Sequence, residues 1–401
     1  MTRDQPVLIA GAGIAGLSVA IALAAQGRQV RVLERRTEPG EAGAGIQIGP
    51  NGTRVLHRLG VLDRLATVLA EPDALQVRDG PSGRVLIEMP LGETIEERHG
   101  TPYIVAHRAD LHAALLAEAG ARPAIQISYG IAVQSATTHG DGVIAMTSDG
   151  VEHRGSALIG ADGLRSQVRR QIGPEARLAF SGFSAARTVI SSALLPESLP
   201  RRNVGLWLAP GAHVVHYPVR HGDDTAFVVV GRDTWSEEGW GTQIEPREVA
   251  ARIQAFSEPI RSAVCRCSQW RKWALYRETV APPLVAGRIA LVGDAAHPVV
   301  PFLAQGAVLA LEDAVTLADC LAETGADVPA GLALYASRRR ARTRRVQQAS
   351  ERNGRVYHMG GPLAAARNIA MRALGGDRLL ARWDWLYGWR DGARAGVAAT
   401  G

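Results

Sequence analysis

The feature that most constrains this chain is a glycine-rich turn near its start, between two apolar segments. Val7–Ala10 has the composition of a short buried strand, and a segment with apolar residues at helical spacing follows the turn. A second apolar strand at 30–33 ends at Glu34. The turn itself consists of Gly11, Ala12, Gly13, Ile14, Ala15 and Gly16. This order of strand, turn, helix, strand and acid is typical of dinucleotide-binding units and predicts an α/β fold with a parallel sheet.

Each glycine of the turn has a physical role in such a unit. Gly11 permits the tight turn, Gly13 lets the backbone approach a pyrophosphate, and Gly16 lets helix and strand pack closely. The phosphates lie on the positive N-terminal end of the helix, and Glu34 is placed to accept hydrogen bonds from ribose hydroxyls. The alternative is a glycine turn that binds no nucleotide. The turn also does not distinguish NAD from FAD.

Two later segments favour FAD. Residues 157–166 and 288–298 each read as a strand that runs into a turn, with Asp162 in the first turn and Asp294, after Gly293, in the second. Ligands of open α/β sheets bind at such carboxyl ends of strands, and an ionised Asp294 accepts hydrogen bonds from the ribityl hydroxyls of a flavin. A helix predicted over 307–321 follows Gly306. Its positive N-terminal end, with Gly306 and Ala307, stabilises negative charge on a reduced flavin.

Composition excludes several other functions. Of the 45 basic residues only Lys272 is a lysine, and it lies in none of the sequence contexts of a P-loop or of a Schiff-base enzyme. The 3 cysteines form no metal-binding pattern and no disulfide framework, so we expect no metal site and a reducing cytoplasm.

The N-terminal apolar stretch and one arginine run have alternative interpretations. Residues 7–25 are almost entirely apolar, but their glycines argue against a membrane helix or a signal peptide, so we expect no membrane association. The net charge is +6, and six arginines gather at 338–345. No basic stripe recurs elsewhere, so we interpret this run as a solvated helix face and expect no nucleic-acid partner.

Together with further segments of the chain, these motifs resemble those of the single-component FAD-dependent aromatic hydroxylases. Para-hydroxybenzoate hydroxylase and salicylate hydroxylase typify this family. The resemblance covers nearly the whole chain and includes Glu34-Arg35 and the segments 43–51, 107–111, 162–163 and 384–388. It implies non-covalent FAD in an extended form, with Arg35 beside Glu34 and with Gln47 and Arg108 near the flavin or its pyrophosphate. Asp162 would serve both FAD and the pyrophosphate of NAD(P)H.

The resemblance also implies a reaction. NADH or NADPH, a transient co-substrate, reduces FAD, O2 then gives a flavin C4a-hydroperoxide, and this attacks a phenolic aromatic acid. The nearest subgroup is the hydroxybenzoate enzymes, in particular 3-hydroxybenzoate 6-hydroxylase, on the segments 45–47, 211–218 and 303–307. The expected reaction is 3-hydroxybenzoate to gentisate, with salicylate or hydroxynicotinate hydroxylation as alternatives. A flavin oxidase and a non-catalytic flavin-binding protein remain rival classes, and homodimers are common among relatives.

A strand predicted around 213–217 carries the candidate substrate residues. His213, Val215 and Tyr217 share one face, with His213 and Tyr217 about 13 Å apart at their Cα atoms, and His216 points the other way. By resemblance His213 lies beside the phenolic oxygen of the substrate, Tyr217 and Gln305 fix the orientation of the ring, and Tyr103 lines the same pocket. We expect His213 to titrate in the range useful for a base. Plain packing of these side chains is the alternative.

The strand pattern predicts a discontinuous arrangement. A Rossmann-like, three-layer FAD-binding domain takes residues 1–75, 101–175 and 276–330, since its strands come from all three stretches. Residues 76–100 and 176–275 alternate apolar and polar residues and predict a mostly antiparallel sheet that binds the substrate. Residues 331–401 predict a helical C-terminal segment.

Overall fold

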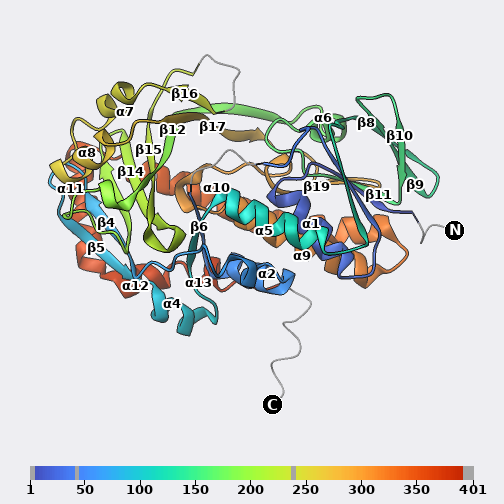
Figure 1. Ribbon diagram of the computed structural model, residues 1–401, viewed down its shortest axis with the longest axis horizontal. Coiled ribbons are helices and arrows are strands. Elements are labelled where there is room, and N and C mark those ends of the chain that lie inside the picture. Colours follow the sequence, from blue (N-terminus) through green and yellow to red (C-terminus); the bar gives the residue numbers. More distant parts are fainter. Residues whose placement is uncertain (1–4, 41–44, 236–240, 392–401) are drawn as a thin grey trace.

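A computed structural model describes residues 5–40, 45–235 and 241–391. Gly43 and Ala44 of the segment 43–51 lie outside these residues. Figure 1 shows two halves, each built on a sheet, with the long C-terminal helices running along both. The predicted class, α/β with one parallel and one mostly antiparallel sheet, is confirmed.

The first half is built on a six-stranded sheet of order β18-β19-β11-β1-β2-β7, in which only β18 runs antiparallel to its neighbour. Its strands are β1 (Val7–Ala10), β2 (Val30–Glu34), β7 (Ile125–Tyr129), β11 (Ala157–Gly160), β18 (Val285–Ala286) and β19 (Ile289–Leu291). The strands therefore come from distant parts of the chain, and all of them except β18 are parallel.

This sheet is the middle of three layers. Val7 and Ile9 of β1 pack into a core with α1 (Ile14–Ala24), α5 (Arg108–Gly120) and α9 (Gly306–Thr324). Leu8 and Ala10 face the other way, onto α6 (Gln167–Ile172) and the three-stranded sheet of β8 (Val133–His139), β9 (Gly142–Thr147) and β10 (Glu152–Gly155). Because both faces are covered, β1 is apolar throughout rather than alternating.

The second half is an eight-stranded sheet of order β16-β17-β12-β15-β14-β13-β4-β5, antiparallel except for the pair β13 and β4. Its strands are β4 (Ala74–Asp79), β5 (Val85–Pro90), β12 (Arg177–Ser191), β13 (Val204–Ala209), β14 (Ala212–Val219), β15 (Asp224–Arg232), β16 (Thr242–Ile244) and β17 (Trp270–Val280). One face packs on α7 (Pro246–Arg252) and α8 (Glu258–Cys265). The opposite face is turned toward the first half.

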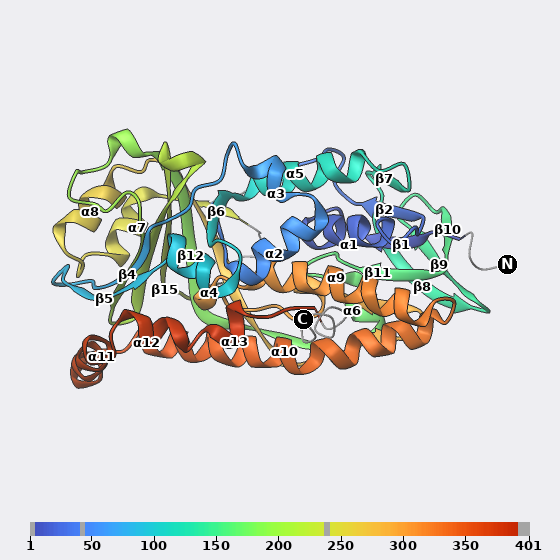
Figure 2. The same ribbon diagram turned by 90° about the horizontal axis from the view of Figure 1, so that it is seen from below.

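The remaining elements lie outside these sheets. They are the strand pair β3 (Gly45–Ile48) and β6 (Ile104–His107), the helices α2 (Pro50–Leu59), α3 (Leu62–Leu65), α4 (Gly92–His99), α10 (Val328–Tyr357), α11 (Gly361–Leu374), α12 (Gly376–Ala381) and α13 (Asp384–Tyr387), and the 3-10 turns η1 (Ser192–Leu194), η2 (Arg220–Gly222), η3 (Gly293–Ala295) and η4 (Pro301–Leu303). Figure 2 shows α10 passing beneath both halves. Its 30 residues make it about 45 Å long.

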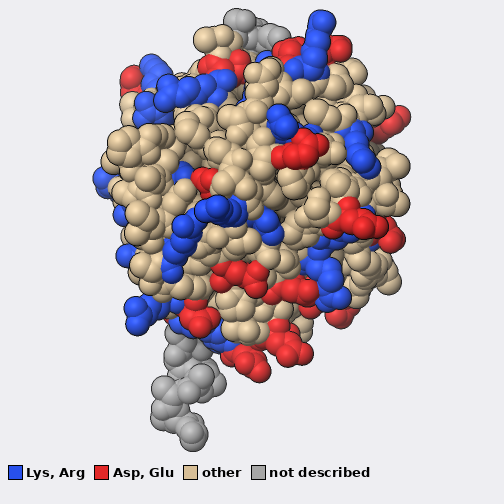
Figure 3. Space-filling view, turned by 90° about the vertical axis from the view of Figure 1, so that its left-hand side faces the viewer, with Lys and Arg blue, Asp and Glu red and all other residues tan. Residues whose placement is uncertain are grey.

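Side chains of one charge do not gather into a patch on the end of the molecule that carries the eight-stranded sheet. Figure 3 shows that end, where basic and acidic side chains are interspersed over its face. Within the described residues, no helix is long and apolar enough to cross a membrane, and no group of three or more histidine, cysteine or acidic side chains is placed to hold a metal ion.

Candidate flavin and substrate site

The glycine turn joins β1 to α1 in a closely packed conformation. Gly11 has a positive φ of 104°, and a Cβ there would lie 2.7 Å from the carbonyl oxygen of Ala161. A Cβ on Gly16 would collide with the carbonyl of Gly11. The N–H of Ala12 donates to Glu34 Oε2 at 2.6 Å, so the acid at the end of β2 also holds the turn. The two glycines are therefore required by steric contact, as the sequence predicts.

The two aspartate turns lie at the carboxyl ends of neighbouring strands. Asp162 follows β11 and accepts hydrogen bonds from the Ser166 hydroxyl and the Gln167 N–H, so its carboxylate caps α6. The Asp294 side chain, in η3 after β19, is exposed. The guanidinium of Arg169 donates to the carbonyls of Asp294 and Ala295 at 3.1 and 3.2 Å. Arg169 thus links the two turns at one edge of the parallel sheet.

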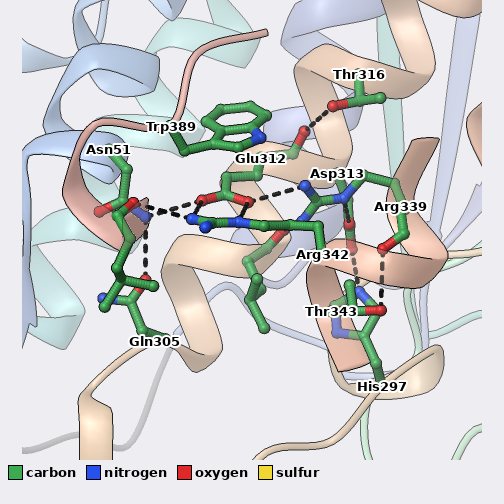
Figure 4. A network of polar contacts seen from close by, with 12 residues as sticks. Asn51, His297, Gln305, Glu312, Asp313, Thr316, Arg339, Arg342, Thr343 and Trp389 are labelled. Atoms are coloured by element: carbon green, nitrogen blue, oxygen red, sulfur yellow. Dashed lines mark hydrogen bonds and ion pairs between the residues drawn. The ribbon is translucent and has the colours of Figure 1, made fainter. Parts of the chain in front are cut away.

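A buried polar network supports the loop before α9 (Figure 4). Asn51 Nδ2 donates to Gln305 Oε1 at 3.0 Å and to Glu312 Oε1 at 2.8 Å. Arg339 binds Glu312 at 2.8 Å and Asp313 at 2.7 Å, and all three side chains are almost completely buried. Burial alone would raise the pKa of Glu312, but the charges of Arg339 and Arg342 hold it below its ordinary value. Gln305 is therefore fixed by an ionised cluster.

Asp313 extends this network to the turn after β19, which contains Gly293 and Asp294. It accepts from the Gly293 N–H at 2.8 Å and contacts His297 Nε2 at 2.6 Å. His297 thus stabilises the turn after β19. The interpretation of 338–345 as a solvated helix face is wrong for Arg339, which is only 1% exposed, and for Arg342, which is 10% exposed. Their partners Glu312 and Asp313 lie on α9, which packs against α10.

Of the candidate substrate residues, His213 and Tyr217 lie on β14, on the face of the eight-stranded sheet that is turned toward the first half. Tyr217 donates to the carbonyl of Gly45 at 2.6 Å, and Tyr103 donates to Gln47 Oε1 at 2.8 Å. Burial raises the pKa of Tyr217 to about 12, even though the charge of Arg187 lowers it. Tyr103 and Tyr217 belong to one apolar cluster, so the structure brings both tyrosines and Gln47 together.

His213 lies two residues before Val215 on the same face of β14. It packs against Phe302 and Tyr357, with ring centroids 5.6 and 5.4 Å away, and its Nδ1 lies 2.8 Å from His358 Nε2. Burial, with the neighbouring His358, holds the pKa of His213 well below its usual value. The expectation that His213 titrates in a useful range is therefore wrong, because the ring is desolvated and stays neutral at physiological pH.

Two residues on or near this face were not predicted from the sequence. One is His358, the C-cap of α10. The other is Arg187 of β12. It pairs with Val228 of β15, which in turn pairs with Val215 of β14, so the three residues lie in one row across the sheet. The Arg187 Nε is shielded from solvent and has no hydrogen-bond partner among the described residues, and its guanidinium lies 5.4 Å from the Trp273 ring. A single arginine in an otherwise apolar strand segment is the signal that would have found it.

Arg187 also interacts electrostatically with several residues predicted for the site. Burial lowers its pKa, and the charged groups that act on it include Tyr217, Arg108 and Asp294. Arg108 begins α5 directly after β6, whereas Arg35 is exposed at the end of β2. The turns after β1, β11 and β19 lie at the carboxyl ends of adjacent parallel strands, where a nucleotide such as FAD binds, and Arg187 Nε is a buried donor without a partner among the described residues.

Comparisons with known proteins agree with this geometry. The family profile described as "FAD binding domain" matches residues 4–350. The chain is 36% identical over 393 residues to 3-hydroxybenzoate 6-hydroxylase of Polaromonas naphthalenivorans, covering 97% of each chain. It is 37% identical to 3-amino-4-hydroxybenzoate 2-monooxygenase of Streptomyces cremeus, covering 96% of this chain and 95% of that one. A salicylate hydroxylase substrate complex superposes with a TM-score of 0.83 at 26% identity, covering 98% and 97%. The chain therefore belongs to the FAD-dependent aromatic hydroxylases, flavoprotein monooxygenases that carry this FAD-binding domain.

Proposed function

We propose that the protein hydroxylates a phenolic aromatic acid with NAD(P)H and O2, and that its leading reaction converts 3-hydroxybenzoate to gentisate. The observation that carries the proposal is the common face of β14, on which His213 and Tyr217 lie toward the half that binds FAD. The names of the relatives support the substrate class, because those above are hydroxylases or monooxygenases of hydroxybenzoates.

The residues of the first half would hold FAD. The turn from Gly11 to Gly16 and the N-terminus of α1 would take the pyrophosphate, Glu34 the ribose, and Asp294 the ribityl hydroxyls. Bound FAD supplies the acceptor for the hydride of NAD(P)H and the site at which O2 is activated. Gly306 and Ala307, at the N-terminus of α9, offer backbone N–H groups and the positive end of the helix dipole.

The second half would position the substrate. The neutral His213 accepts a hydrogen bond from the phenolic hydroxyl at Nε2, and the Gln305 amide fixes the orientation of the substrate. Tyr217 remains protonated at neutral pH because its pKa is about 12, so it serves as a neutral hydrogen-bonding group. Tyr103 lines the same space. Arg187 supplies the cation for the carboxylate of the aromatic acid, which also compensates the cost of burying its guanidinium.

The test is NADH oxidation by the FAD-loaded protein with 3-hydroxybenzoate, 3-amino-4-hydroxybenzoate, salicylate or 6-hydroxynicotinate, with product and peroxide quantified together. Stimulation by 3-hydroxybenzoate, with gentisate formed in proportion to the NADH consumed, supports the proposal. Coupled product from another acid reassigns the substrate. Peroxide without a hydroxylated product from any acid refutes the proposed hydroxylation, and oxidation of an organic substrate without NADH indicates a flavin oxidase.

A further inference from the structure

His213 of β14 and His358, the C-cap of α10, form a close pair. Their facing nitrogens, Nδ1 of His213 and Nε2 of His358, are 2.8 Å apart. Phe183 stacks on the His358 ring, with centroids 4.5 Å apart and planes inclined by 12°. Phe302 and Tyr357 contact the His213 ring edge to face. Aromatic contacts thus hold both rings, and the nitrogen of His213 that does not face His358 is Nε2.

The pair is neutral in the folded protein. Burial lowers the pKa of His213 well below its usual value, and burial with the nearby charges of Arg232 and Arg367 lowers the pKa of His358 to about 4. At 2.8 Å, two neutral imidazoles share one proton, so one ring donates and the other accepts. When His213 Nε2 takes up a proton and His213 Nδ1 passes its own proton to His358 Nε2, His213 changes tautomer, its Nε2 changes from an acceptor to a donor, and the ring stays neutral.

We propose that His213 and His358 form a proton relay that carries the phenolic proton of the substrate from the apolar site to solvent. The relay rests on the proposed function. In the outward step the phenol O–H bond breaks and an N–H bond forms at His213 Nε2. The proton on His213 Nδ1 moves to His358 Nε2, and the proton on His358 Nδ1 passes to water. Each ring gains one proton and loses one, and the phenolate keeps the electron pair.

The position of His358 suits the outer end of this relay. His213 is 3% exposed, whereas His358 retains accessible surface at the C-terminal end of α10. The charged and titratable groups around His358 are Arg232 of β15, Arg367 of α11 and His213, with Tyr357 directly before it. The two arginines repel a proton held on His358, which favours its release to water over its storage. The relay thus explains how a histidine with a depressed pKa serves as a base.

His358→Gln and His358→Asn test the proposal, because an amide of similar size can bond to His213 but cannot accept and release a proton along the same line. The control is Phe183→Leu, which loosens the stack on His358 but keeps both imidazoles, so it measures the effect of packing alone. FAD-loaded proteins are mixed anaerobically with 3-hydroxybenzoate, and proton release is followed with a pH indicator and phenolate formation by ultraviolet difference spectra. We expect both His358 variants to slow proton release about tenfold or more and to raise the pH at which bound phenol ionises, with Phe183→Leu close to wild type.

Three outcomes overturn the relay. In the first, the His358 variants release the proton as fast as wild type and with the same pH profile. In the second, Phe183→Leu slows release as much as His358→Gln, which indicates a packing role only. In the third, no phenolic acid stimulates NADH oxidation by the wild-type protein, and the proposed function fails together with the relay. If wild type forms hydroxylated product in proportion to the NADH consumed, and His358→Gln releases the proton as fast as wild type, the relay is refuted and the proposed function is not.

Discussion

Arg339→Met gives the most direct test of the buried network. The variant removes the hydrogen bonds of 2.8 Å to Glu312 and 2.7 Å to Asp313 and leaves two carboxylates in a space that solvent does not reach. Breaking a buried ion pair by removing one partner costs about 3 to 5 kcal/mol. For 401 residues, an unfolding entropy of about 2.1 cal/mol/K per residue converts about 4 kcal/mol into a melting temperature about 5 °C lower.

The assay is the thermal unfolding midpoint at one scan rate, with Arg338→Met as the matched control. Arg338 is the preceding residue, but it pairs with Glu323 at the surface, where removal of an ion pair costs about 1 kcal/mol or less. Without Arg339, the pKa values of Glu312 and Asp313 rise from their lowered values in wild type, although Arg342 and His297 still contact the two carboxylates. Wild type therefore loses more stability than the variant as the carboxylates become protonated, so the deficit of the variant shrinks as the pH falls. An Arg339→Met protein no less stable than Arg338→Met, or a deficit that grows in acid, refutes the reasoning.

Three further predictions concern single side chains. Asp294→Ala should weaken FAD binding about 10- to 100-fold, measured by flavin fluorescence, while Asp141→Ala in the turn between β8 and β9 should not change it. Arg187→Met should raise the KM for 3-hydroxybenzoate much more than that for the neutral phenol resorcinol, and equal changes would disprove the carboxylate contact. Burial lowers the pKa of His216 to about 3, so its contribution to stability is complete above the unfolded pKa of about 6.5 and falls as the pH drops below it. Between about pH 8 and about pH 5, wild type should therefore lose about 2 kcal/mol more than His216→Leu, and equal losses in chemical denaturation would contradict this.

Local patterns in the sequence predict the first half of the fold well. The order of Val7–Ala10, the glycine turn and Glu34 predicts strand, helix and strand, because the steric demand for Gly11 and Gly16 is local to the turn. The helix predicted at 307–321 is observed as α9, Gly306–Thr324. The alternation around residue 215 correctly places His213 and Tyr217 on one face and His216 on the other.

The environment of these side chains is less predictable, because it depends on segments far apart in the chain. Desolvation lowers the pKa of His213 only once β14, the loop at Phe302 and the end of α10 meet. The buried state of Arg339 likewise depends on α9. One signal is present in the sequence: Glu312 and Asp313 interrupt the apolar stretch 307–315 of this helix, and two buried carboxylates require a cation. A search for an arginine partner would have led to α10.

The order of strands in the parallel sheet has a consequence for synthesis of the chain on the ribosome. On one side β1 pairs with β2, which follows soon after it in the chain. On its other side β1 pairs with β11, which begins only at Ala157, and β11 pairs in turn with β19, which begins only at Ile289. A nascent chain therefore carries an apolar strand with an unpaired edge while most of the protein is still being made. Such edges template pairing with other chains, and late, non-local closure slows folding. Expression at low temperature or with chaperones should therefore raise the soluble yield of this protein more than any stabilising substitution within β1.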